Sequence, residues 1–187
     1  MKTALMIMDM QKDFVGPKAS LRVKGGKEIV PRIEKALEAS RKAGLPIFHI
    51  MRQHRADGSD VEKFRYEMFK KTPYAVEKTE GAEMIEELAP KDGETVLPKT
   101  RFSAFFHTNL DAILRRRGVG KIVLVGIQSP NCIRATAVDA LALDYDVVLL
   151  TDAIGSKTKE IHDANMRDMG NMGMEIKTVD DFIKTLK

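Results

Sequence analysis

Asp9, Lys99 and Cys132 are residue types that can together carry out nucleophilic chemistry. Each of them follows an apolar stretch of the chain, and Cys132 is the only cysteine. A charged side chain behind a buried strand is poorly solvated and needs a partner. In combination, the carboxylate can accept the thiol proton, the ammonium group can hold the carboxylate, and the thiolate can attack a carbonyl carbon.

Each of these residues also has an ordinary structural interpretation. Alone, Asp9 would cap a turn or a helix, and Lys99 would be a surface lysine. Cys132 lies between an apolar stretch, residues 122–125, and a helical pattern, residues 135–143. Most free cysteines are small buried hydrophobic residues, whereas a thiol at a helix N-terminus feels the positive end of the dipole, which favours the thiolate. Position alone leaves the two interpretations level, and the second predicts a lowered pKa for Cys132.

The composition excludes several classes of protein. A hydrophobic content of 43% with 31% charged residues is typical of a globular domain. The net charge of +4 is spread among acidic residues, and three tyrosines without tryptophan offer no basic, aromatic face for nucleic acid. No apolar stretch is long enough for a bilayer, and the N-terminus lacks a signal-peptide pattern. A single cysteine cannot form an internal disulfide, so we expect a cytoplasmic protein without a nucleic-acid or membrane partner.

Strand and helix patterns alternate along one predicted domain, residues 1–187. Predicted strands lie at residues 3–8, 45–51, 94–98, 122–127, 146–150 and 175–179, and predicted helices at residues 29–43, 81–88, 103–117, 135–143, 160–170 and 180–186. Residues 52–79 are polar and aperiodic. Alternating strands and helices favour a parallel sheet covered on both faces, in which ligands bind beyond the carboxyl ends of the strands. The three reactive residues are expected at that edge.

Three motifs occur in order along the chain. They are Met-Asp-Met-Gln-Lys-Asp-Phe at 8–14, Pro-Lys-Thr-Arg-Phe-Ser-Ala-Phe at 98–105, and Gly-Ile-Gln-Ser-Pro-Asn-Cys-Ile-Arg-Ala-Thr-Ala at 126–137. Together they resemble the signatures of the isochorismatase-like cysteine hydrolases, which include nicotinamidases, N-carbamoylsarcosine amidase and ureidoacrylate amidohydrolase. The resemblance spans nearly the whole chain, and residues 54–65 look closest to a poorly characterised branch.

The resemblance implies a fold and a set of roles. The fold is α/β, a three-layer α/β/α sandwich with a mostly parallel six-stranded sheet in the Rossmann-like order 3-2-1-4-5-6. By the resemblance, Asp9 is the general base, Lys99 its charged partner and Cys132 the nucleophile. It also implies a non-proline cis peptide at Ile127-Gln128, with the backbone amides of Gln128 and Cys132 forming an oxyanion hole. Members of the family usually assemble as homodimers or homotetramers, which is the expectation here.

The stretch after the second predicted strand departs from nicotinamidases, which typically bind a metal through Asp-x-His and a further histidine. Here it reads Arg52-Gln53-His54, and no histidine occurs between His54 and His107. A guanidinium group at a ligand position would repel a cation. We therefore predict no metal and no other cofactor, and leave open whether His54 joins a degenerate metal site.

The leading hypothesis is a metal-independent cysteine amidohydrolase that cleaves a C–N bond of a small, anionic amide or ureido compound through a thioester. Arg52, Arg55 and Arg65 could bind the substrate's carboxylate by bidentate contacts, unless they are solvated surface charges. Phe14, which follows the base, could wall the pocket or be ordinary core. The alternatives are an isochorismatase-type vinyl-ether hydrolase and a non-catalytic member, either a thiol sensor or an assembly subunit.

Overall fold

The fold was analysed in a computed structural model that describes residues 1–186. The strands are β1 (Lys2–Met8), β2 (Ile47–Arg52), β3 (Thr95–Lys99), β4 (Val119–Ile127), β5 (Asp146–Gly155) and β6 (Glu175–Lys177). The α-helices are α1 (Lys12–Val15), α2 (Val30–Lys42), α3 (Tyr66–Lys71), α4 (Leu110–Arg116), α5 (Arg134–Ala142), α6 (Lys159–Asn171) and α7 (Val179–Lys184). Short 3₁₀ turns span Lys63–Arg65, Glu80–Ala82 and Glu86–Leu88, and a π turn spans Ser129–Ile133.

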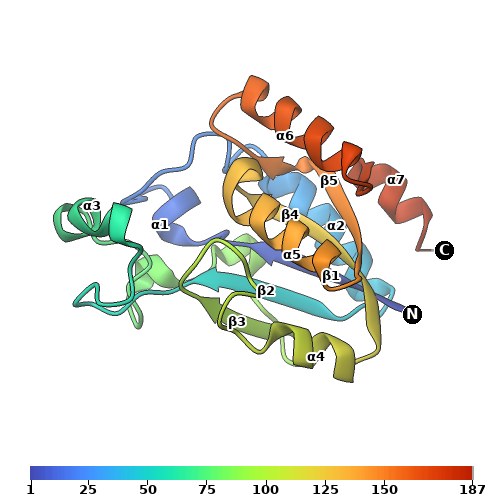
Figure 1. The fold of residues 1–187 in the computed structure, drawn as a ribbon, viewed down its shortest axis with the longest axis horizontal. Helices are drawn as coiled ribbons and strands as arrows, with labels where there is room; N and C mark the ends of the chain where they lie inside the picture. Colours follow the sequence, from blue (N-terminus) through green and yellow to red (C-terminus); the bar gives the residue numbers. More distant parts are fainter. Residues whose placement is uncertain (187) are drawn as a thin grey trace.

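The strands form one sheet in the order β3-β2-β1-β4-β5-β6, with every neighbouring pair parallel. The predicted strand order and three-layer architecture are confirmed, and the sheet is wholly rather than mostly parallel within residues 1–186. Helices cover both of its faces (Figure 1). Because both faces are covered, the central strands are buried along nearly their whole length and read as continuous apolar runs.

Two hydrophobic cores lie on opposite faces of the sheet. Leu5 and Ile7 of β1 pack in the core that includes residues of α2 and α7, whereas Met6 and Met8 pack in the core that includes residues of α4, α5 and α6. This alternation follows from the period of two in a strand. Within residues 1–186, no helix is both long enough and apolar enough to cross a membrane.

The predicted helix at residues 103–117 is wrong over its first half. Only Leu110–Arg116 is α-helical, and the residues before it form turns and bends. One cause is the hydroxyl group of Thr136, which accepts a hydrogen bond from the backbone N–H of Ala104 at 3.0 Å. A backbone N–H with such a partner has no need of a helical carbonyl.

The predicted helix at residues 81–88 is also wrong, because two separate 3₁₀ turns, Glu80–Ala82 and Glu86–Leu88, take its place. Between them, the carbonyl of Glu83 accepts a hydrogen bond from the backbone N–H of Lys12 at 2.9 Å. The aperiodic segment 52–79 contains α3 and the 3₁₀ turn before it. Both α3 and the 3₁₀ turn before it lie beyond β2 in the chain. Figure 1 shows α3 projecting past the carboxyl end of β2, with both termini at the opposite end of the molecule.

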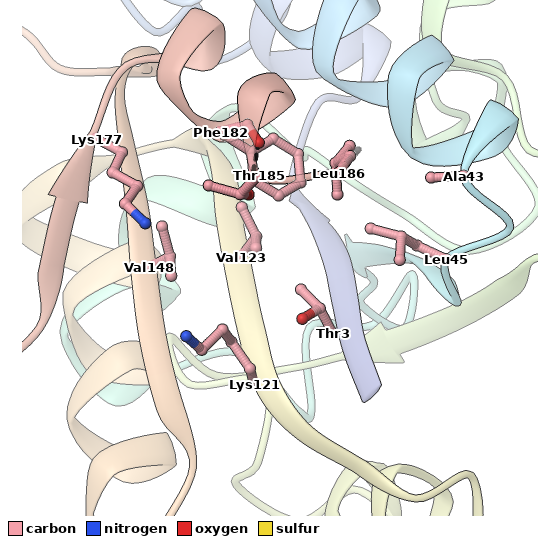
Figure 2. A pocket seen from close by; sticks show the side chains of 10 residues that line it. All are labelled: Thr3, Ala43, Leu45, Lys121, Val123, Val148, Lys177, Phe182, Thr185 and Leu186. Carbon is pink, nitrogen blue, oxygen red and sulfur yellow. Dashed lines mark hydrogen bonds between the residues drawn. The ribbon is translucent and has the colours of Figure 1, made fainter. Parts of the chain in front are cut away.

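A cavity of about 430 Å³ opens on the face between α2 and α7, lined by residues from the amino-terminal parts of β1 and β4. Figure 2 shows its two lysines, Lys121 and Lys177, on one side and Leu45 on the other. Both lysines already pair with Glu175, at 3.3 and 2.6 Å. The residues predicted to react lie elsewhere, at the carboxyl ends of the strands.

Candidate active site

Asp9, Lys99 and Cys132 meet at the carboxyl edge of the sheet. Asp9 directly follows β1, Lys99 is the last residue of β3, and Cys132 lies in the turn between β4 and α5. The ammonium group of Lys99 donates hydrogen bonds to Asp9 Oδ2 at 2.9 Å and to Cys132 Sγ at 3.3 Å. All three residues are buried, so their charges interact in surroundings that screen weakly.

The second oxygen of Asp9 is the group free to accept a proton. The third hydrogen bond of the Lys99 ammonium group goes to the carbonyl oxygen of Arg101, at 3.2 Å. Asp9 Oδ1 is buried and has no hydrogen-bond partner among residues 1–186. The backbone of Asp9 has a φ of 54°, in the left-handed region that aspartate tolerates better than most residues.

The turn that carries Cys132 begins with a close approach between β1 and β4. Gly126 pairs with Met8, and a Cβ atom on this glycine would lie 2.3 Å from the carbonyl oxygen of Met8. The next peptide bond, Ile127-Gln128, is cis, as the resemblance predicted. The backbone N–H of Ile133 then donates to the carbonyl of Gln128 at 3.3 Å, and the chain enters α5.

The prediction that Cys132 has a lowered pKa is wrong. Burial raises the pKa of the thiol and the carboxylate of Asp9 raises it further, and together they outweigh the lowering by Lys99 and Arg52. The helix-dipole argument fails because the thiol is enclosed and α5 begins only at Arg134. The thiol is therefore the resting form, and a base has to remove its proton when it attacks.

A pocket of about 300 Å³ opens over the thiol. Its lining residues are Asp9, Phe14, Leu21, Arg22, Val23, Arg52, Phe64, Arg65, Met68, Phe102, Ile127, Gln128, Asn131 and Cys132. Phe14, Arg52 and Arg65 thus line the same pocket as Asp9 and Cys132. Arg55 does not line this pocket. Its backbone N–H donates to Asp60, and Arg55 lines a separate cavity of about 230 Å³.

Arg52 is held firmly at the inner end of this pocket. Its backbone N–H donates to the amide oxygen of Gln11 at 2.7 Å, and the Gln11 amide nitrogen donates back to the carbonyl of Arg52 at 2.7 Å. Its guanidinium group pairs with Glu62 and approaches Cys132. The role of Gln11 as a clamp for β2 was not predicted, since nothing in the sequence signals a side chain that replaces a strand partner.

The outer wall alternates guanidinium groups with aromatic rings. The guanidinium carbon of Arg52 lies 5.5 Å from the ring centroid of Phe102, and that of Arg65 lies 4.9 Å from the same centroid. Arg65 also lies over Phe64, which is 71% exposed at the pocket rim. Sequence reasoning missed Phe64 and Arg22 as lining residues, because both lie in segments without periodicity.

The residues near His54 do not fit the metal that nicotinamidases bind. Arg52 stands at the place of the aspartate ligand, and its charge would repel a cation. The Nδ1 atom of His54 lies 3.3 Å from Asp60, and its ring packs edge-on against Phe69 and Tyr74. No group of three or more His, Cys, Asp or Glu side chains within residues 1–186 is placed to hold a metal ion.

Comparisons with known proteins agree with this geometry. The sequence model of the isochorismatase domain matches residues 3–181. An isochorismatase family protein from Desulfovibrio vulgaris has the same fold, with a TM-score of 0.95 and 47% identity over 99% of this chain and 98% of that one. A probable inactive nicotinamidase from Arabidopsis thaliana is 43% identical, covering 98% of this chain and 96% of its own length. The maleamate amidohydrolase of Pseudomonas putida is 30% identical, over 100% of this chain and 87% of its own.

Proposed function

We propose that this chain, which belongs to the isochorismatase family, hydrolyses a small anionic amide or ureido compound through a thioester on Cys132. It is a hydrolase that acts on carbon–nitrogen bonds other than peptide bonds. The observation that carries the proposal is the buried ammonium group of Lys99, within hydrogen-bond distance of both Asp9 and Cys132. The same ammonium group can stabilise the negative charge of Asp9 before proton transfer and that of the Cys132 thiolate after it.

The reaction runs in two halves. In the first, Asp9 Oδ1 takes the thiol proton while Cys132 Sγ attacks the carbonyl carbon, and the backbone N–H groups of Gln128 and Cys132 hold the oxyanion. The C–N bond then breaks, and the leaving amine takes the proton from Asp9. In the second half, Asp9 removes a proton from water, hydroxide attacks the thioester, and the acid leaves as the thiol recovers its proton.

The pocket supports an anionic substrate. Arg65 and Arg22 line it in addition to the reactive residues, and Phe14 with Phe102 supplies apolar wall. Guanidinium groups bind carboxylates by paired hydrogen bonds, which gives orientation as well as affinity. The volume of about 300 Å³ is at the small end of ligand pockets, which suits a compact acid.

The test is ammonia release from a panel of small amides, ureido acids and nicotinamide. We expect turnover of at least one anionic member, lost in Cys132→Ala, Asp9→Asn and Lys99→Ala. Hydroxylamine added during turnover should intercept the thioester and yield a hydroxamate. A variant lacking Cys132 that hydrolyses the substrate at the wild-type rate would rule out the thioester route.

The alternatives make different predictions. A vinyl-ether hydrolase would release no ammonia and would not need Cys132. A thiol sensor or assembly subunit would need neither the carboxylate nor the ammonium group, whereas in this chain the ammonium group of Lys99 contacts both Asp9 and the thiol. The Arabidopsis relative is named a probable inactive nicotinamidase, and Arg52 argues against nicotinamide as the best substrate of this chain.

A further inference from the structure

Arg52 is a buried cation that the reaction above does not use. It is the last residue of β2 and pairs in register with Lys99 of β3, so both side chains leave the sheet side by side. Its exposed fraction is 2%. The Nη2 atom donates to Cys132 Sγ at 3.7 Å, which is within hydrogen-bond range for sulfur.

Both hydrogens of Nη1 are committed away from the pocket. Nη1 donates to Glu62 Oε1 at 2.6 Å and to the carbonyl oxygen of Thr100 at 2.7 Å. The ring of Phe102 lies against the guanidinium group. A substrate carboxylate that sought a paired contact with both Nη atoms of Arg52 would have to displace one of the partners of Nη1. The geometry therefore favours Cys132, rather than the substrate, as the partner of Nη2.

Among the described residues, the side chain of Glu62 forms an ion pair with Arg52 alone. It is a nearly buried carboxylate, and Oε2 has no hydrogen-bond partner among residues 1–186. Burying a carboxylate is costly unless it is paired. The segment that carries it is anchored nearby, since Arg101 Nη1 donates to the carbonyl of Asp60 at 2.5 Å. An anchored carboxylate can fix the direction in which the guanidinium group points.

We propose that Arg52 is a fourth catalytic residue, which stabilises the thiolate of Cys132, and that Glu62 is a positioning residue, which holds the guanidinium group against the sulfur. The inference rests on the proposed role of Cys132 as the nucleophile. It moves Arg52 from substrate binding to activation of the thiol and leaves the anion to Arg65 and Arg22.

The charge balance of proton transfer explains what Arg52 adds. When the proton moves, the negative charge shifts from Asp9 to Cys132. Lys99 contacts both groups, whereas Arg52 donates to the sulfur and makes no hydrogen bond to Asp9 in the described residues. A donor that favours the charge after transfer over the charge before it lowers the barrier to that step.

The experiment is a pH titration of the thiolate by its ultraviolet absorbance. Cys132 is the only cysteine, so subtracting the Cys132→Ser variant isolates its signal from tyrosine. Arg52→Met should raise the apparent pKa of the thiol by about 1 to 3 units, the effect of an opposite charge at this range. Arg41→Met is the control, because it removes a part-buried arginine that is also paired with a glutamate, Glu94, but at the amino end of β3, away from the thiol. Its titration should match the wild type.

Glu62 variants separate position from charge. Glu62→Ala should raise the apparent pKa because it releases Arg52, although removing a negative charge by itself would lower it. Glu62→Gln keeps an acceptor for Nη1, so the pKa should stay or fall. A fall in Glu62→Ala, or an equal rise in both variants, would contradict the positioning role. Since Arg52→Met leaves Glu62 unpaired, the double variant Arg52→Met/Glu62→Gln provides a second measurement. The pKa should still rise there, but by less than in Arg52→Met, because the negative charge of Glu62 is removed as well.

The titration needs no substrate, so it is decided independently of the proposed function. An unchanged titration in Arg52→Met and in the double variant overturns the role of Arg52, even if Cys132→Ala abolishes ammonia release. The opposite pattern, a raised pKa in a protein that hydrolyses no amide, keeps the stabilisation of the Cys132 thiolate by Arg52 but removes the proposed function and, with it, the catalytic role of Arg52. With a substrate in hand, Arg52→Met should lower kcat at least tenfold and change KM little.

Discussion

Arg65 sits at the open side of the pocket, between the rings of Phe64 and Phe102. If it binds the acid group of the substrate, Arg65→Met should lower kcat/KM for an anionic amide at least tenfold, because about 1.4 kcal/mol suffices. The neutral ester of the same compound should be affected much less. Arg55→Met, in the same segment but outside the pocket, is the control. Equal wild-type rates on acid and ester would show that Arg65 is only a surface charge.

Metal independence is the second prediction that depends on single residues. Arg52 stands where nicotinamidases have the aspartate of their Asp-x-His pair, and it is already paired with Glu62. Activity on the substrate found by ammonia release should therefore survive exhaustive chelation and should not rise on addition of zinc, manganese or iron. Loss on chelation with rescue by one ion would make His54 and Asp60 candidate ligands.

Packing between β1 and β4 sets the geometry just before the nucleophile. Gly126 has a φ of +111°, and a Cβ atom there would lie 2.3 Å from Met8 O, so Gly126→Ala must push the two strands apart. We expect a loss of roughly 1–3 kcal/mol in the free energy of unfolding, with a larger loss of activity than of stability.

Gly44→Ala is the matched control for that substitution. Gly44 also has a positive φ, +67°, but a Cβ atom there would meet nothing within 4 Å. It should therefore cost only the conformational penalty of about 1–2 kcal/mol and leave activity intact. Urea unfolding measures both variants, and similar activity losses in the two would show that the close approach of β4 to β1 is unimportant for the site.

Glu94 ties together three parts of the molecule. It accepts hydrogen bonds from Arg41 of α2, from the His49 ring of β2, and from the backbone N–H of Lys91 before β3. Burial works against ionisation of Glu94, but Arg41 and these hydrogen bonds prevail and hold its pKa at about 2, below the ordinary 4.5. A lowered folded-state pKa means that the stability it contributes is present above about pH 4.5 and is lost as the pH falls towards 2.

Thermal unfolding between pH 7 and pH 2 measures this contribution. The wild type should be more stable than Glu94→Gln at neutral pH, and the difference should shrink through the acid range. A difference that stays constant with pH would show that the charge of Glu94 is not what stabilises the fold.

The expected homodimer or homotetramer is a separate prediction, which light scattering of the purified protein measures.

Local sequence was enough to place the reactive groups. Asp9, Lys99 and Cys132 follow apolar strands, and parallel strands bring their carboxyl ends to one edge, so the three side chains had to converge there. The cis bond before Gln128 and the strand order came from the resemblance that the three motifs carry. The turn at residues 103–108 escaped prediction in part because Thr136, the partner of the backbone N–H of Ala104, lies about thirty residues away.

Tertiary structure decided the charge state and the partners of these groups. Whether Cys132 rests as a thiol depends on its burial and on the charges of Asp9, Lys99 and Arg52, which come from the ends of three different strands and which no local pattern encodes. Arg52 and Arg55 are three residues apart, yet one faces the nucleophile and the other lies outside the pocket. Side-chain direction at the end of a strand is set by partners such as Glu62 and Gln11, and only folding brings those within reach.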